Sequence, residues 1–213
     1  MSPTRRTAVA AGILYFVTHV TSVAALVLYG GSGTGADWLA AHRGSVLAGA
    51  VLEIVLAVAV VGTAVALFPL LRERAPAVAS GYLALRTLEA SVILAGVVTI
   101  LPIVAAPAST SLPGLAPDVA QGLALAHDWT FLIGPGLVVP VHTVLLALHL
   151  WRSGRAPRFI AALGLVGGPL VGLMNLGVMF GVTGIVPILV VPVFAWEITL
   201  AGWLILRGLR EPS

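Results

Sequence analysis

Six long apolar stretches run through this chain and constrain its fold more than any other feature. Each provides the roughly 20 residues that a helix needs to cross about 30 Å of hydrocarbon. Lipid offers the backbone no hydrogen-bond partners, so segments that span it must satisfy their own backbone groups as helices. The sequence therefore predicts an all-α fold: a polytopic integral membrane bundle of six transmembrane helices, forming a single transmembrane domain over residues 1–213. The predicted spans lie near residues 8–29, 44–68, 81–105, 121–150, 159–180 and 185–206.

The scarcity of charge supports the same conclusion. Only 9% of the residues are charged, against about 25% in soluble domains, which is too few to cover a water-exposed surface. The chain has no cysteine and no lysine, so thiolate metal sites, cysteine nucleophiles and lysine Schiff bases are excluded. The sequence pI of about 10.2 does not indicate a nucleic-acid partner, because the arginines gather at the ends of the spans, where they act as topology signals.

The arginines also predict the orientation of the spans. When six spans alternate across the membrane, nine of the eleven arginines fall on one side, and the opposite connections, near residues 30–43, 106–120 and 181–184, hold a single arginine. An excess of basic residues marks the cytoplasmic side of a membrane protein. Both termini are therefore predicted to be cytoplasmic. The nine arginines are Arg5, Arg6, Arg72, Arg74, Arg152, Arg155, Arg158, Arg207 and Arg210.

The fourth span differs from the others in length and in helix-breaking residues. It is overlong, and Gly134-Pro135-Gly136 and Pro140 interrupt it. A proline inside a helix removes a backbone donor and clashes with the preceding turn. We therefore expect this span to be kinked or broken.

Ionisable side chains inside the apolar stretches are the strongest functional signal. An ionisable group at the centre of a transmembrane helix costs roughly 2.5–3.5 kcal/mol on insertion scales, so each one is by default a candidate functional residue. At 1.5 Å per residue, three glutamates and a histidine on four different spans lie roughly 12–18 Å from the span ends, near the midplane. A common depth suggests one shared interior site. The ionisable residues are Glu53, Arg86, Glu89, Asp128 and Glu197, and the histidine is His19.

Small residues indicate which helix faces point into the bundle. Glycine and alanine stripes at i, i+4 spacing mark close helix packing in membranes. Glu53 continues such a stripe on the second span, and Asn175 continues the stripe of Gly164, Gly168 and Gly172 on the fifth. We therefore expect Glu53 and Asn175 to face the interior of the bundle.

Arg86 and Glu89, at i, i+3, are expected to pair on one helix face. The pair has a structural and a functional reading. In the structural reading it only fixes helix packing. In the functional reading Arg86 either holds an anionic headgroup or sets the protonation state of Glu89. Glu53 and Glu197 have no obvious cation nearby in the sequence, and desolvation favours their protonated forms. A buried carboxylic acid is a general acid or proton carrier, and the alternative is an interhelical hydrogen bond worth well under about 2 kcal/mol. The candidate catalytic residues are Glu53, Glu197 and Glu89, and the candidate substrate-binding residues are Arg86, His19, His127, Asp128 and Asn175.

The sequence predicts no metal and no other cofactor. Buried glutamates and histidines are suitable metal ligands, but the chain has neither a Glu-x-x-His nor a His-Glu-x-x-His spacing to support a site. It also has no aspartate-rich motif of the kind that holds a prenyl diphosphate through Mg²⁺.

Five segments together resemble a known family. The Arg-x-x-Glu of the third span and the Pro-Arg that opens the fifth are its most specific parts. The chain is similar to the bacterial six-span membrane family known as a domain of unknown function, number four-three-eight-six. This resemblance implies a multi-pass protein of the bacterial cytoplasmic (inner) membrane, and it implies neither an activity nor site residues. The segments are 4–6 with 11–15, Leu67-Phe68-Pro69-Leu70-Leu71-Arg72, 81–90, Ala156-Pro157-Arg158-Phe159-Ile160, and 196–197 with 202–208.

Three classes of function remain open. The first is an intramembrane site that binds, or processes by acid–base chemistry, a lipid or isoprenoid-like substrate, for example by a cyclisation that begins with protonation. The second is a small proton- or ion-coupled transporter, for which midplane acids and a broken helix are typical. The third is a non-catalytic membrane interaction protein. The expected partners are membrane lipids and a hydrophobic small molecule, and the sequence leaves both the enzyme question and the oligomeric state open.

Overall fold

The computed structural model describes residues 3–31, 33–105 and 114–210, which are helical almost throughout and contain no strand. Six helices are long and apolar enough to cross a membrane, which confirms the predicted all-α, six-span fold. The elements are α1 (Pro3–Leu28), α2 (Ala36–Ala41), α3 (Arg43–Arg72), α4 (Pro76–Ala105), α5 (Pro117–Ile133), η2 (Gly134–Val138), α6 (Val139–Ser153), α7 (Arg158–Met179), η3 (Pro187–Val190) and α8 (Val191–Leu206).

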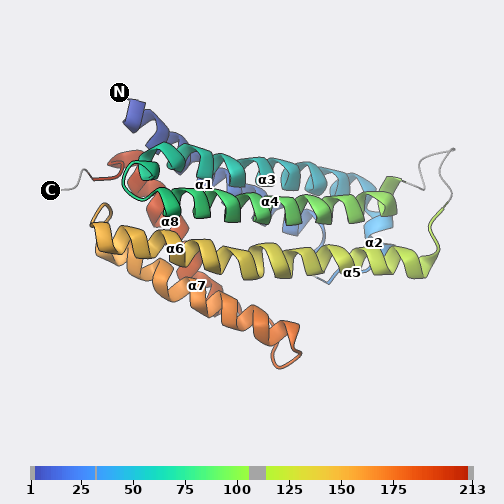
Figure 1. The fold of residues 1–213 in the computed structure, drawn as a ribbon. Coiled ribbons are helices and arrows are strands. Elements are labelled where there is room, and N and C mark those ends of the chain that lie inside the picture. Colours follow the sequence, from blue (N-terminus) through green and yellow to red (C-terminus); the bar gives the residue numbers. More distant parts are fainter. Residues whose placement is uncertain (1–2, 32, 106–113, 211–213) are drawn as a thin grey trace.

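The long helices lie side by side, and α1 begins at the same end of the bundle at which α8 ends (Figure 1). The α3–α4 and α6–α7 turns lie at this end too (Figure 1). It carries the nine arginines of the predicted cytoplasmic side, so we call it the arginine end. The predicted connection at residues 106–120 is described only from residue 114, and α5 already begins within it at Pro117; residues 106–113 lie outside the described residues.

Apolar side chains form a separate core at each end of the bundle. At the arginine end, α1, α3, α4, α6, α7 and α8 all contribute to one cluster, in which Leu67, Tyr82, Leu150 and Trp196 are almost fully buried. At the opposite end a second cluster joins only α1 to α5, with the short α2 closing it. Helices α7 and α8 contribute nothing to the second cluster.

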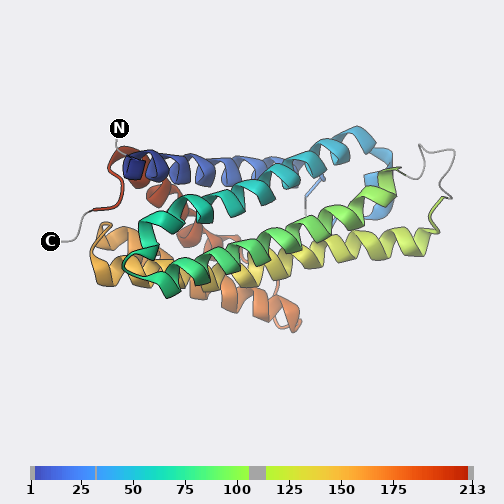
Figure 2. The same ribbon diagram turned by 45° about the horizontal axis from the view of Figure 1, so that its top comes forward.

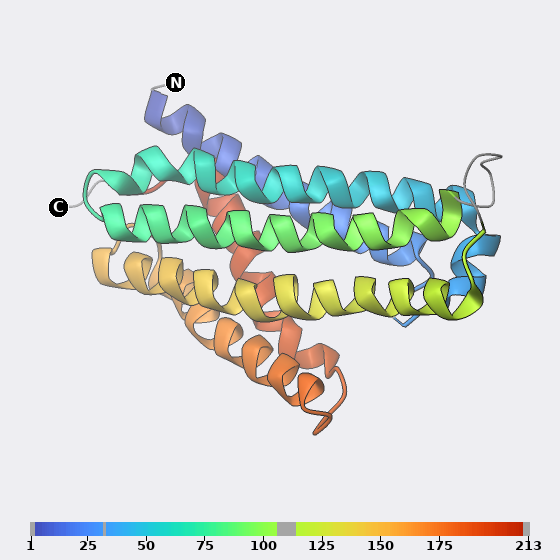
Figure 3. The same ribbon diagram turned by 45° about the vertical axis from the view of Figure 1, so that its right-hand side comes forward.

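The α7–α8 hairpin therefore packs against the bundle at one end and leans away from it towards the other (Figures 2 and 3). Helix α7 packs mainly against α6 and α8, and also contacts η2 and η3. Its glycines permit this packing. A Cβ atom at Gly164 would lie 2.8 Å from both Ala147 and Trp196, and one at Gly168 would lie 2.9 Å from Val144. The glycine stripe of the fifth span thus lies at a helix–helix contact, as its spacing predicts.

The fourth span is continuous but changes its winding. Its glycine–proline interruption forms the π-helical segment η2, and α5 and α6 continue on either side. Pro135 and Pro140 lack backbone N–H donors, so two i→i−4 hydrogen bonds of a regular α-helix cannot form. A wider, π-helical turn lets the chain continue as a helix across this segment. The span is therefore not broken, and the irregularity expected from its prolines and glycines takes the form of a local π-helix. The absence of a side chain at Gly136 also matters, since a Cβ atom there would lie 2.9 Å from the Asn175 amide oxygen.

Candidate functional site

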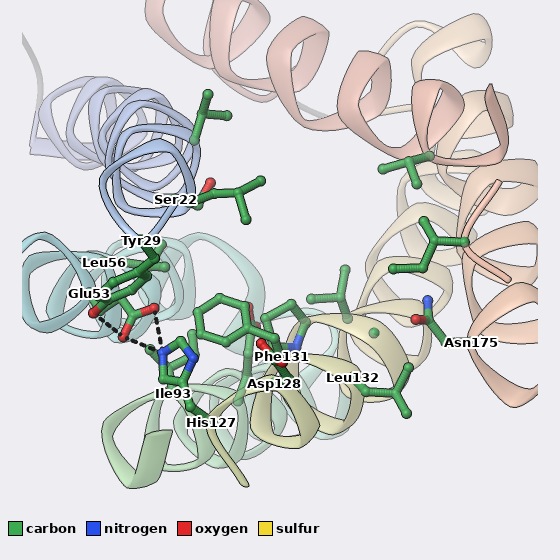
Figure 4. Close-up of a pocket in the computed structure, with 18 of the residues that line it drawn as sticks. Ser22, Tyr29, Glu53, Leu56, Ile93, His127, Asp128, Phe131, Leu132 and Asn175 are labelled. Atoms are coloured by element: carbon green, nitrogen blue, oxygen red, sulfur yellow. Dashed lines mark hydrogen bonds and ion pairs between the residues drawn. The ribbon is translucent and has the colours of Figure 1, made fainter. Parts of the chain in front are cut away.

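A cavity of about 680 Å³ lies between the two apolar cores and is lined mainly by α1, α3, α4, α5, η2, α7 and α8. Most of its wall is apolar, and Leu56, Ile93 and Phe131 are among the side chains that line it (Figure 4). The structure brings all eight candidate residues from the sequence to this one wall. They are Glu53, Glu89, Glu197, Arg86, His19, His127, Asp128 and Asn175.

Glu53 of α3 pairs with a histidine from α5. His127 Nε2 lies 3.2 Å from both carboxyl oxygens of Glu53, and the Tyr29 hydroxyl donates a hydrogen bond to Oε2 at 3.0 Å. Figure 4 shows the three side chains gathered at one side of the cavity. The Tyr29 and His127 rings also meet edge to face, 5.0 Å apart. Because the Glu53 side chain is only 1% exposed, protein groups rather than water satisfy this carboxyl.

Glu89 of α4 has two partners. Arg86 Nη1 donates to Glu89 Oε2 at 3.0 Å, and His142 Nε2 of α6 lies 2.9 Å from the same oxygen. Arg86 Nε also donates to the Thr63 hydroxyl at 3.2 Å and to the Val60 carbonyl at 3.3 Å. The Nε of Arg86 therefore links α4 to α3, while its pairing with Glu89 neutralises both charges. The Nη2 group is left over, because it is buried without a partner among the described residues.

Glu197 of α8 lies beside His19 of α1. Their closest atoms, His19 Nε2 and Glu197 Oε2, are 3.4 Å apart. His19 Nδ1 lies 2.9 Å from the Tyr15 carbonyl, which can only accept, so Nδ1 carries a hydrogen. A contact between Nε2 and the carboxyl then requires one further proton, either on the ring or on Glu197. At 11% and 15% exposure of their side chains, these two residues form the most accessible of the pairs.

The two remaining candidates differ in their surroundings. Asn175 of α7 is buried, and its Nδ2 donates to the Val171 carbonyl at 2.9 Å. This leaves its amide oxygen beside Gly136 of the π-helical segment. Asp128 of α5 is half-buried, and its carboxyl accepts a hydrogen bond from the Gly33 backbone. Asp128 therefore belongs to the end of the cavity farther from the arginine end.

The pairing of each acid with a histidine did not follow from the sequence, although His19 and His127 were already candidate residues. No cation stands near Glu53 or Glu197 along the chain, because their partners come from other helices. His142, which is 1% exposed, and Tyr29 were not among the candidate residues. Only a weak signal in the sequence pointed to His142. A histidine inside an apolar span is unfavourable in lipid, and His142 is one of only five histidines in the chain.

The three acid–histidine pairs differ in chemical capacity. Glu89 is held by a permanent cation, Arg86, so its charge is fixed. Glu53 and Glu197 have no permanent cation beside them: Glu53 contacts His127 and the Tyr29 hydroxyl, and Glu197 contacts His19. Imidazole is the side chain that most readily gains or loses a proton near neutral pH, so these two acids are the candidates for proton exchange at the cavity wall. In the part of the chain that the structure describes, no three His, Asp or Glu side chains gather in a way that would hold a metal ion.

A family model described as "Domain of unknown function (DUF4386)" matches residues 10–208. The chain therefore belongs to this family, as the resemblance of its segments predicted. No curated protein and no solved structure matches the chain.

Proposed function

We propose that this membrane protein of the DUF4386 family binds an apolar, lipid- or isoprenoid-like molecule in its central cavity and exchanges a proton with it. One observation carries the proposal: a mostly apolar cavity whose wall holds Glu53 and Glu197, each beside a histidine and neither paired with an arginine. We further propose the bacterial cytoplasmic membrane as its location, in line with the sequence resemblance.

The size and position of the cavity support an apolar ligand. A volume of about 680 Å³ falls within the roughly 300–1,000 Å³ of small-molecule sites, which are mostly apolar with a few placed polar groups. The cavity lies on the side where the α7–α8 hairpin leans away from α5. A molecule dissolved in the bilayer would enter there without crossing a polar surface.

The charges around the cavity favour a ligand with a neutral polar end. Four carboxyl groups line the wall, and the only arginine, Arg86, is already paired with Glu89. A phosphate or carboxylate would meet three acids that have no permanent cation beside them, and Arg86 could offer it only the Nη2 group that Glu89 leaves free. Of the two roles considered for this arginine, the contacts support the setting of the Glu89 charge over the holding of an anionic headgroup.

The proposed chemistry is a proton transfer without net consumption of a reagent. A protonated Glu53 or Glu197 donates its proton to one carbon of a substrate double bond, and the π electrons form the new C–H bond. The resulting carbocation rearranges or cyclises and then loses a proton from carbon. The electron pair of that C–H bond restores a double bond, and a carboxylate or neutral histidine of either pair takes the proton. The product is an isomer of the substrate.

Native mass spectrometry of protein purified in mild detergent tests this proposal. The wild type should retain an organic molecule, and incubation in D₂O should add deuterium to that molecule in single mass steps. Glu53→Gln and Glu197→Gln keep the side-chain shape and remove the exchangeable proton. One or both should fold normally and lose the deuterium incorporation. Asp118→Asn, an exposed acid outside the cavity, is the matched control. A wild-type protein that retains no organic molecule, or equal incorporation in all variants, contradicts the proposal.

A proton-coupled carrier is the second candidate, and the π-helical segment favours it. Pro135 and Gly136 of η2 lie on the cavity wall, and irregular helix winding at a central site is typical of transporters. The packed core at the arginine end would have to open during transport. Proteoliposomes with an enclosed pH dye distinguish the two candidates, because a carrier moves protons when its substrate is added and an isomerase does not.

A further inference from the structure

A second, smaller cavity lies apart from the central one, at the arginine end of the bundle. It has a volume of about 370 Å³ and is lined by Val78, Leu145, Leu148, His149, Arg152 and Ser153. It lies between the first turn of α4 and the last two turns of α6. Gly81 of α4 helps to keep it open, because a Cβ atom there would lie 3.2 Å from Leu145.

Two polar atoms in this cavity lack partners. His149 Nε2 and Ser153 Oγ are both buried, and neither has a hydrogen bond within the described ranges. An unsatisfied buried polar group costs about 1–3 kcal/mol, and native structures rarely leave one without a reason. His149 and Ser153 are half-buried and Arg152 is exposed, so the cavity opens at the surface, and a polar ligand there would satisfy both atoms.

The side chains identify the chemistry of that ligand. His149, Arg152 and Ser153 are at i, i+3 and i+4 on α6, so they share a helix face. An imidazole N–H, a guanidinium and a hydroxyl all donate hydrogen bonds, and an arginine binds phosphate through paired, charge-assisted bonds. None of the described residues that line the cavity is an acid. The N-terminal end of α4 carries a partial positive charge and the C-terminal end of α6 a partial negative one, so the two helix dipoles oppose each other. The charge of Arg152 then decides the sign of the electrostatic potential in the cavity, and it favours an anion.

The position of the cavity suits a group at the membrane surface. Trp151, which is exposed beside it on α6, stacks with Arg158 at 5.9 Å, and tryptophan is enriched at membrane–water interfaces. The apolar part of the wall, Val78, Leu145 and Leu148, lies alongside the polar part. We infer that this cavity binds a phosphate group, with the three donors of α6 on its oxygens and the leucines against any attached chain. This inference does not depend on the function proposed for the central cavity.

Two measurements test the inference and distinguish a lipid headgroup from free phosphate. The first is native mass spectrometry of protein from nanodiscs of phosphatidylcholine with or without phosphatidylglycerol. The second is thermal unfolding in neutral detergent with inorganic phosphate against chloride at equal ionic strength. Retained phosphatidylglycerol would identify a lipid, and protection by inorganic phosphate alone would identify a soluble source.

Arg152→Gln should weaken whichever binding is seen by roughly tenfold or more, since it removes a charged hydrogen-bond donor. Arg207→Gln, an exposed arginine at the same end that does not line the cavity, should leave binding unchanged. Ser153→Ala adds an independent check. It removes a buried hydroxyl that has no partner, so it should raise the melting temperature measured without phosphate. It also removes a donor to the ligand, so it should weaken phosphate binding. The inference is overturned if the wild type binds neither phosphate source, or if Arg152→Gln and Arg207→Gln bind alike.

Discussion

Replacing Arg86 with leucine should destabilise the protein strongly, and a second change should reverse most of the loss. Arg86 is 2% exposed and donates to Glu89, Thr63 and the Val60 carbonyl. Arg86→Leu leaves Glu89 as a buried carboxylate with only His142 beside it. Removal of one partner of a buried ion pair costs about 3–5 kcal/mol. Because the His142 contact at 2.9 Å remains, we expect a loss of about 3 kcal/mol, at the lower end of this range.

The compensating change is Glu89→Gln, made together with Arg86→Leu. The amide has no charge to leave stranded, and its oxygen still accepts a hydrogen bond from His142. Thr63 is not orphaned either, because its hydroxyl donates to the Val60 carbonyl at 2.7 Å. The double variant should therefore be more stable than Arg86→Leu alone by about 2 kcal/mol, since a neutral replacement of a buried ion pair is often harmless.

The assay is reversible unfolding in mixed detergent micelles, run on the wild type, both single variants and the double variant as a double-mutant cycle. Arg207→Leu, at an exposed arginine, is the control and should stay within about 0.5 kcal/mol of the wild type. A double variant as unstable as Arg86→Leu, or additive losses in the two single variants, would refute the reasoning. Either result would mean that the two charges do not depend on each other.

Three further predictions concern packing, orientation and the cavity wall. Gly167→Ala should lower the folded yield and the thermal stability sharply, because its Cβ atom would lie 2.5 Å from the Val193 backbone nitrogen. Gly202→Ala, which has open space around it, is the control and should fold as the wild type does. Equal thermal stability of the two variants would contradict the close approach of α7 and α8. On this cysteine-free chain, Arg74→Cys should react with a membrane-impermeant thiol reagent only after lysis and Asp37→Cys in intact cells, and the reverse pattern would invert the predicted orientation. Tyr29→Phe removes the 3.0 Å hydrogen bond to Glu53 and should cost about 0.6 kcal/mol in micelle unfolding, the mean for such bonds in membranes; no measurable loss would show that the bond contributes nothing to stability.

Local patterns predicted much of the candidate site. The hydropathy of each stretch gave the spans, and the count of residues from the span ends gave the common depth of Glu53, Glu89 and Glu197. Small residues at i, i+4 marked the buried faces that hold Glu53 and Asn175. Each inference needs only one helix, because depth and face follow from the rise and period of the helix itself.

Partners across helices did not follow from those patterns. His127 and Glu53 are 74 residues apart in the chain and 3.2 Å apart in space. The sequence contains both residues but no rule that joins them. In lipid, helices are not driven together by a difference in hydrophobicity, so their arrangement depends on detailed side-chain packing. The pairing of each acid with a histidine is therefore a property of the assembled bundle.

By itself, the sequence determined the class of the protein: six apolar helices, arginines gathered at one end and a belt of acids near mid-depth. These features arise from local composition and helix geometry, and they hold for any packing of the spans. The tertiary structure alone decided that α7 and α8 lean away from α5, that the fourth span winds into a π-helix rather than breaking, and that a cavity remains between the two apolar cores. The physical reason is that two helices can approach closely only where the side chains on their facing surfaces fit together, and the sequence of one helix does not say which surface it will face. Gly164 and Gly168 let α7 seat against α6 and α8, and the hairpin lacks the apolar core that would hold its other end against the bundle.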